Sequence, residues 1–126
     1  MSEKILNEVK YKEALEAMEK GDEKAKTIVA YHKLTGLGGV EKDVKGAVVL
    51  LEERVKDKDP EAEWMLGLCY EYGIGIEQDI ERAELLYGQS SEKGNVIGKF
   101  LLENGRRGEG RGSGVMDASV NPWKCL

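Results

Sequence analysis

Apolar residues recur at helical spacing between positions 62 and 90, in two runs separated by a glycine-rich break. The apolar positions of the first run share one helix face: Ala62, Met65, Leu66, Cys69 and Tyr70. The break is Gly73-Ile74-Gly75, and glycine ends helices because it adopts positive φ without steric cost. The second run follows Asp79, and its inner face comprises Ile80, Ala83, Leu86, Tyr87 and Ser90. The pattern predicts a helix–turn–helix unit that Gly94-Asn95 closes.

A weaker copy of this unit precedes it in the chain. With an offset of 37 residues, Ala25 falls on Ala62 and Gly36-Leu37-Gly38 falls on Gly73-Ile74-Gly75. Past the turn the offset is 36, because Gly39 is one extra loop residue. A period of 36–37 residues with two helices per unit is typical of helical solenoids, in which each unit buries its apolar face against its neighbours.

The residues that flank the two units predict partial repeats. Residues 3–21 are rich in strong helix formers and are expected to form an N-terminal capping helix, equivalent to the second helix of a preceding repeat. Residues 22–58 are the degenerate repeat and residues 59–94 the well-matched one. Residues 95–104 supply the first helix of a partial third repeat, which Gly105 is expected to end. Asp and Asn are favoured at helix N-caps, and five such residues are expected to cap helices: Asp22, Asp43, Asp59, Asp79 and Asn95.

The composition changes at Gly105. Residues 105–126 are rich in glycine and arginine, and they are expected to form a flexible tail. Five apolar residues leave an alternative open, in which the tail folds back over the open end of the solenoid: Val115, Met116, Val120, Trp123 and Leu126. The predicted fold class is all-α, a right-handed α-solenoid of antiparallel helix pairs with about five helices in residues 1–104, followed by this tail.

The unit from Pro60 to Gly94 resembles the Sel-one-like repeat (SLR) family, a relative of the tetratricopeptide repeat. The family pattern is A-x3-LG-x2-Y-x2-G-x-G-V-x2-D-x2-KA-x2-WY, closing on a glycine. The residues that match it are Ala62, Leu66-Gly67, Tyr70, Gly73-x-Gly75-Ile76, Asp79, Ala83, Tyr87 and Gly94. The preceding unit is degenerate, since Ala30, Lys33 and Gly46 stand where the pattern has glycine, tyrosine and lysine. The resemblance implies a non-enzymatic adaptor or scaffold that binds other proteins.

Charge and composition narrow the class of partner. The net charge is −5 and aromatic residues make up 6%, which does not favour nucleic acid, whose binding proteins are strongly basic. No apolar run approaches the roughly 18–20 residues of a membrane-spanning helix, and the N-terminus lacks the apolar core of a signal peptide. Two cysteines make no disulfide framework, so a reduced, cytoplasmic location is expected.

Few residues suggest chemistry. The single histidine, His32, and Cys69 hold equivalent positions in the two repeats, and a Cys–His pair is a nucleophile in some enzymes. Their repeat equivalence explains the coincidence more simply, and too few Cys, His and acidic residues cluster to predict a metal site. No catalytic residue, metal or cofactor is therefore predicted. A small, hydrolase-like SLR-type enzyme remains the alternative function.

Partner recognition is the predicted function. Stacked helix pairs form a curved surface lined by the first helix of each repeat, and such a groove accepts an extended peptide or a helix. Two equivalent stripes on these helices are predicted to contact the partner: Met65, Cys69 and Tyr72 in one repeat, and Ile28, His32 and Thr35 in the other. A competing interpretation assigns Met65 and Ile28 to the core. Self-association as a homodimer through the exposed terminal face is a further alternative, because so few repeats approach the lower limit for a stable array.

Overall fold

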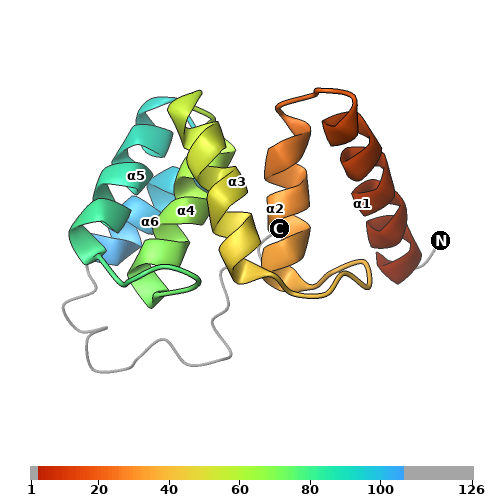
Figure 1. The fold of residues 1–126 in the computed structure, drawn as a ribbon. Coiled ribbons are helices and arrows are strands. Elements are labelled where there is room, and N and C mark those ends of the chain that lie inside the picture. The colour runs from red at the N-terminus through yellow and green to blue at the C-terminus, as the bar shows by residue number, and fades with distance from the viewer. Residues whose placement is uncertain (1–2, 107–126) are drawn as a thin grey trace.

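The computed structural model describes residues 3–106, and these residues form six α-helices (Figure 1). The helices are α1 Glu3–Glu19, α2 Ala25–Thr35, α3 Val44–Lys56, α4 Pro60–Tyr72, α5 Ile80–Glu92 and α6 Val96–Arg106. The described residues contain no strand, and the predicted all-α solenoid is confirmed. They are the capping helix, two helices in each of the two repeats and the one helix of the partial third repeat, α6, where about five helices were expected.

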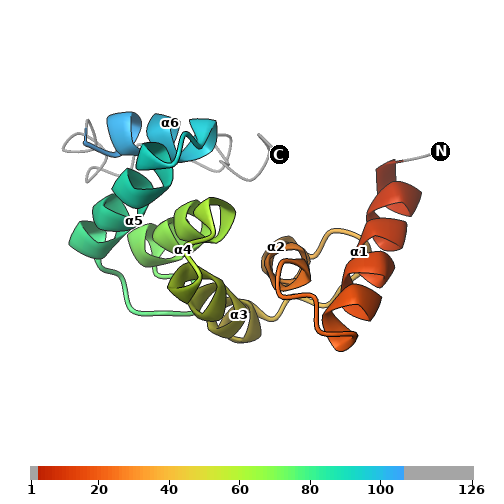
Figure 2. The same ribbon diagram turned by 90° about the horizontal axis from the view of Figure 1, so that it is seen from above.

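The helices stack in chain order. Each helix packs against the next one in the sequence, and the first helices of successive repeats (α2, α4 and α6) also contact one another. Seen from above, the array follows an arc from α1 to α6 (Figure 2). Helix α4 lies in the middle of this arc, and every residue from Ala62 to Glu71 is buried.

Four of the five expected N-caps are confirmed. The side chains of Asp43, Asp59, Asp79 and Asn95 accept hydrogen bonds from backbone N–H groups in the first turn of the helix that each precedes. The expectation for Asp22 is wrong. Helix α2 begins at Ala25, and Asp22 Oδ1 instead accepts from the backbone N–H of Lys24 in the connecting turn, at 3.0 Å.

Two turn glycines bring the backbone of one unit against the helix before it. A Cβ on Gly75 would lie 2.8 Å from the carbonyl oxygen of Val44, the first residue of α3. A Cβ on Gly38 would lie 2.9 Å from the carbonyl oxygen of Asn7 in α1. Both glycines also have positive φ, so any side chain would be strained as well as crowded. The G-x-G turns therefore join successive units through main-chain atoms.

Helix α6 passes the expected boundary. Gly105 lies inside the helix, which continues to Arg106. A single glycine costs about 1 kcal/mol in a helix and does not by itself end one. The expected tail covers residues 105–126, and of these residues 107–126 lie outside the described part of the chain.

Candidate partner-binding groove

Helices α1, α2 and the start of α4 enclose a groove of about 670 Å³. Figure 2 shows the arrangement, with α2 between α1 and α4. The groove is lined mainly by small and apolar side chains: Ala14, Ala17, Ala25, Ile28, Tyr31 and Met65. Charged residues of both signs surround them: Lys10, Glu13, Asp22, Lys24 and Glu61. A volume in this range and an apolar lining with a few polar groups are typical of ligand-binding sites.

Three of the six residues predicted to contact a partner line this groove. Ile28 is 47% exposed, whereas Met65 and His32 are 6% and 2% exposed. His32 is held in place, because its Nδ1 donates to the carbonyl oxygen of Leu37 at 2.9 Å and its ring packs against the rings of Tyr11 and Tyr31. The imidazole thus joins α1, α2 and the following turn, and Ile28 presents the largest apolar surface of the three.

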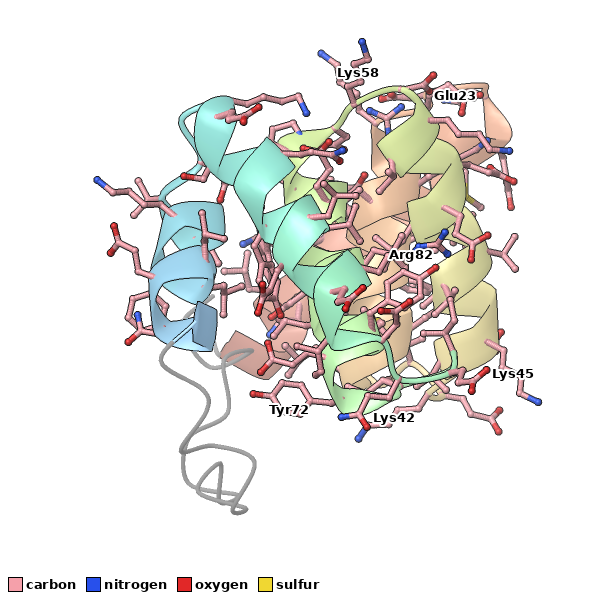
Figure 3. All side chains as sticks on the ribbon, turned by 90° about the vertical axis from the view of Figure 1, so that its left-hand side faces the viewer. Glu23, Lys42, Lys45, Lys58, Tyr72 and Arg82 are labelled. Atoms are coloured by element: carbon pink, nitrogen blue, oxygen red, sulfur yellow. The ribbon has the colours of Figure 1, made fainter. Side chains whose placement is uncertain are left out.

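The other three residues do not line the groove. Thr35 ends α2, where its hydroxyl donates to the Tyr31 carbonyl oxygen at 2.9 Å and accepts from the backbone N–H of Leu37. Cys69 is completely buried within α4. Tyr72 is 37% exposed at the end of α4, at the edge of the molecule that carries the turn (Figure 3). The structure therefore separates the members of each predicted stripe.

Helix α1 supplies a wall of the groove that the sequence analysis missed. Lys10, Ala14 and Ala17 recur at a spacing of three or four residues and so share one face of α1. Alanines at such positions let another chain approach the helix closely. This spacing was visible in the sequence, but a capping helix was expected to serve stability alone.

A polar cluster fixes the end of the groove formed by α2 and α4. The Thr27 hydroxyl donates to Asp59 Oδ2 at 2.6 Å, which joins α2 to the N-cap of α4. Arg54 from α3 is 7% exposed and lies 3.0 Å from Asp57 and 3.4 Å from Asp59. Three helices are therefore connected where the groove ends, and the relative position of α2 and α4 does not depend on apolar contacts alone.

A second contact holds the two helices of the well-matched repeat together. Arg82 in α5 reaches the Tyr70 ring of α4, with Cζ 5.5 Å from the ring centroid and Nη1 donating to the hydroxyl at 3.2 Å. Lys93 Nζ lies 2.6 Å from Glu63, which is 2% exposed. These interactions support α4 from the side opposite the groove.

The described residues offer little for catalysis. Burial raises the pKa of the Cys69 thiol from 9.0 to about 12, whereas nucleophilic cysteines have a lowered pKa. Across residues 3–106, no group of three or more His, Cys, Asp or Glu side chains could hold a metal ion. Within the same range, no helix is long and apolar enough to span a bilayer.

Comparisons with known proteins agree with this architecture. Residues 24–53 and 60–95 match the family model of the Sel1 repeat. A Sel1 repeat protein from Oxalobacter formigenes is 30% identical over 72% of this chain and 68% of its own, with a TM-score of 0.64. The structure of c5321, a protective antigen of uropathogenic Escherichia coli strains with an SLR fold, is 27% identical. It covers 90% of this chain with a TM-score of 0.63, and this chain spans 23% of its length. A search of curated proteins found no match.

Proposed function

The chain belongs to the Sel1 repeat family, and from this premise we propose that it is an adaptor that binds an apolar segment of a partner protein in the groove between α1, α2 and α4. Sel1 repeats are generally modules of protein–protein interaction, and proteins built from them are typically non-enzymatic scaffolds. A cytoplasmic location belongs to the same proposal.

The exposure of Ile28 is the observation that carries this proposal. An aliphatic side chain that is 47% exposed inside a concave, largely apolar site loses water contact when a partner fills the site. Burial of its exposed half contributes about 1 kcal/mol. Met65 and His32 are already buried by the chain itself, so they shape the floor of the groove and offer a partner little surface.

The mixed charges around the groove set the expected specificity. Lys10 and Lys24 stand beside Glu13, Asp22 and Glu61, so a partner segment with an apolar centre and charges of both signs fits better than a purely acidic or basic one. Tyr72, Thr35 and Cys69 lie outside the groove, and a role for them in binding stays a prediction.

Peptides selected from a displayed random library against the intact chain test the proposal. Selected peptides are expected to be rich in apolar residues and to bind Ile28→Glu at least about tenfold more weakly than the unmodified chain, by fluorescence polarisation. Val49→Glu is the matched control, because Val49 is an exposed β-branched residue of α3 (57%) outside the groove. Equal binding to the unmodified chain and both variants would refute the site, provided that both retain the helical circular dichroism of the parent.

Sedimentation of the chain alone separates partner binding from self-association. A monomer over a wide concentration range is expected. A stable dimer that Ile28→Glu dissociates would show that a second copy of the chain occupies the groove.

A further inference from the structure

Helix α1 holds the position of the second helix of a repeat. Gly38 contacts Asn7 of α1 as Gly75 contacts Val44 of α3, and both members of the second pair come 37 residues later. Helix α1 also packs against α2, as α3 packs against α4 and α5 against α6 (Figure 2). Helices α3 and α5 each have a first helix of their own, α2 and α4, whereas no described helix takes this position next to α1.

In the well-matched repeat, the corresponding face of the second helix holds the first helix. The contacts of α5 and the residue after it with α4 include those of Arg82, Ala83, Tyr87, Ser90 and Lys93. One period of 36 and one of 37 residues earlier, the equivalent residues are, in the same order, Val9, Lys10, Ala14, Ala17 and Lys20. Lys10, Ala14 and Ala17 line the groove, so the groove lies where a first helix would pack against α1.

Apolar residues on both sides of this position are exposed. Leu6 and Val9 of α1 are 42% and 40% exposed, and they share a face with Lys10 by their spacing of three and four residues. Ile28 of α2 is 47% exposed. Met65 holds the position of Ile28 in α4, which has α2 packed against it, and is only 6% exposed. A helix beside α1 and α2 would therefore cover apolar surface on each of them.

We propose that the partner segment bound in the groove is an amphipathic α-helix, which takes the position of a first helix against α1 and α2. This inference rests on the adaptor function proposed above and defines what occupies the groove. A helix satisfies its own backbone hydrogen bonds, whereas an extended segment commonly binds by pairing with the edge of a sheet. Residues 3–106 contain no strand that could offer such an edge.

The packing of the complete repeats predicts the size of the central side chain of the partner helix. Each pairs a large residue with a small one, since Tyr87 lies against Gly67 in the well-matched repeat and Leu51 and Ala30 hold these positions in the degenerate one. Helix α1 has Ala14 at the position of Tyr87 and Leu51. The small residue is thus already on α1, and the partner helix has room for a large apolar residue opposite it.

Lys20 predicts a charge on the partner helix. Lys93 Nζ lies 2.6 Å from the carboxylate of Glu63, which precedes Gly67 by four residues. Lys20 directly follows α1 as Lys93 directly follows α5, and it is exposed. A glutamate four residues before the large apolar residue of the partner would therefore reach Lys20.

Val9 predicts a second apolar contact. Its equivalent, Arg82, lies against the ring of Tyr70, which follows Gly67 by three residues. An aromatic residue of the partner, three residues after the large apolar one, would lie on Val9 in the same way. The three predicted positions are spaced i, i+4 and i+7 and so share one helix face.

A synthetic peptide of about 15 residues, built on alanine and glutamine as helix formers, tests the inference. It carries glutamate, leucine and tyrosine at the three predicted positions and a fluorescent label. It is expected to bind the intact chain and to gain helical circular dichroism on binding. A second peptide, in which proline replaces a central alanine, is expected to bind at least about tenfold more weakly by fluorescence polarisation.

Two substitutions outside the groove lining test the position of the helix. Val9→Asp is expected to weaken binding of the helical peptide at least about fivefold, because it places a charge in an apolar contact. Lys20→Glu is expected to weaken it about two- to fivefold, and a peptide with lysine in place of glutamate should regain affinity for this variant. Lys12→Glu is the matched control, since Lys12 is an exposed residue of α1 equivalent to Val49 and Leu85, which are also exposed.

The outcomes separate this inference from the proposed function. Failure of the helical peptide to bind, or equal binding to Val9→Asp, Lys20→Glu and the unmodified chain, would overturn the helix. Library-selected peptides that still depend on Ile28 would in that case leave the groove as the site. Loss of all dependence on Ile28 would refute the groove and the helix together. A dimer of the chain alone that Val9→Asp dissociates would overturn the assignment to a partner, because a second copy would then supply the helix.

Discussion

Replacement of Gly67 by alanine places a methyl group in the contact between α4 and α5. A Cβ built on Gly67 lies 2.5 Å from Cε1 and 2.8 Å from Cδ1 of the Tyr87 ring, well inside van der Waals contact. Tyr87 is 1% exposed, and its hydroxyl donates to Glu71 Oε1 at 2.8 Å. The ring therefore cannot move away without loss of a buried hydrogen bond, and we expect Gly67→Ala to destabilise the fold.

The magnitude follows from two opposed effects. Alanine favours the helix by about 1 kcal/mol relative to glycine. Overpacking of a buried site costs about 1–3 kcal/mol, and weakening of the bond between Tyr87 and Glu71 adds about 1 kcal/mol. The free energy of unfolding is therefore expected to fall by about 1–3 kcal/mol, measured by urea denaturation followed by far-UV circular dichroism.

Gly88 provides the matched control. It also lies inside a helix, α5, but a Cβ there meets no atom within 4 Å. Gly88→Ala gains the helix propensity without the collision, so it should raise the free energy of unfolding by about 1 kcal/mol. In a Tyr87→Leu background the ring atoms are absent, and Gly67→Ala should then cost less. Equal effects of Gly67→Ala and Gly88→Ala would refute the claim that close packing on Tyr87 requires the glycine.

Three further predictions concern caps, a buried ion pair and pH. Asp79→Ala removes a confirmed N-cap and should lower the free energy of unfolding by about 1 kcal/mol in the same denaturation assay. Asp22→Ala is the control: it removes no N-cap and should change the free energy of unfolding by less than about 0.5 kcal/mol. Lys93→Ala leaves the buried Glu63 carboxylate without its ion pair and should cost about 1–3 kcal/mol, part of which the double variant with Glu63→Gln should recover. Burial raises the pKa of Cys69 from 9.0 to about 12, so unfolding releases a proton from this thiol above pH 9.0. The contribution of Cys69 to stability should be constant below pH 9.0 and fall by up to about 1.4 kcal/mol per pH unit toward about 12. Cys69→Ala should make the decline above pH 9.0 less steep, and an unchanged slope in this variant would contradict the reasoning.

The sequence was sufficient to predict the structural features that depend only on residues within one repeat. Glycines, N-caps and apolar spacing act within one hairpin, so the helices and the turns at Gly38 and Gly75 could be predicted from their own residues. Asp22 was predicted wrongly because Asp and Asn also occur in turns just outside helices, where the side chain accepts a hydrogen bond without capping.

The exposure of individual residues could not be predicted from the repeat. Ile28 and Met65 hold the same position in successive units, yet they are 47% and 6% exposed. Helix α4 packs against α3, α5 and α6, whereas α2 packs mainly against α1 and α3. Burial therefore depends on where a unit stands in the stack. The predicted stripes assumed that equivalent positions are equally exposed, which explains why only three of their six residues line the groove.

The contacts of Gly38 and Gly75 also bear on how such a protein can change over time. Neighbouring hairpins meet there through peptide groups, which every sequence shares, so these contacts do not depend on the surface side chains. The curvature of the array can thus persist while residues along its inner wall are exchanged. Ile28 could be replaced without altering the shape of the scaffold, so recognition of a new ligand requires no new architecture.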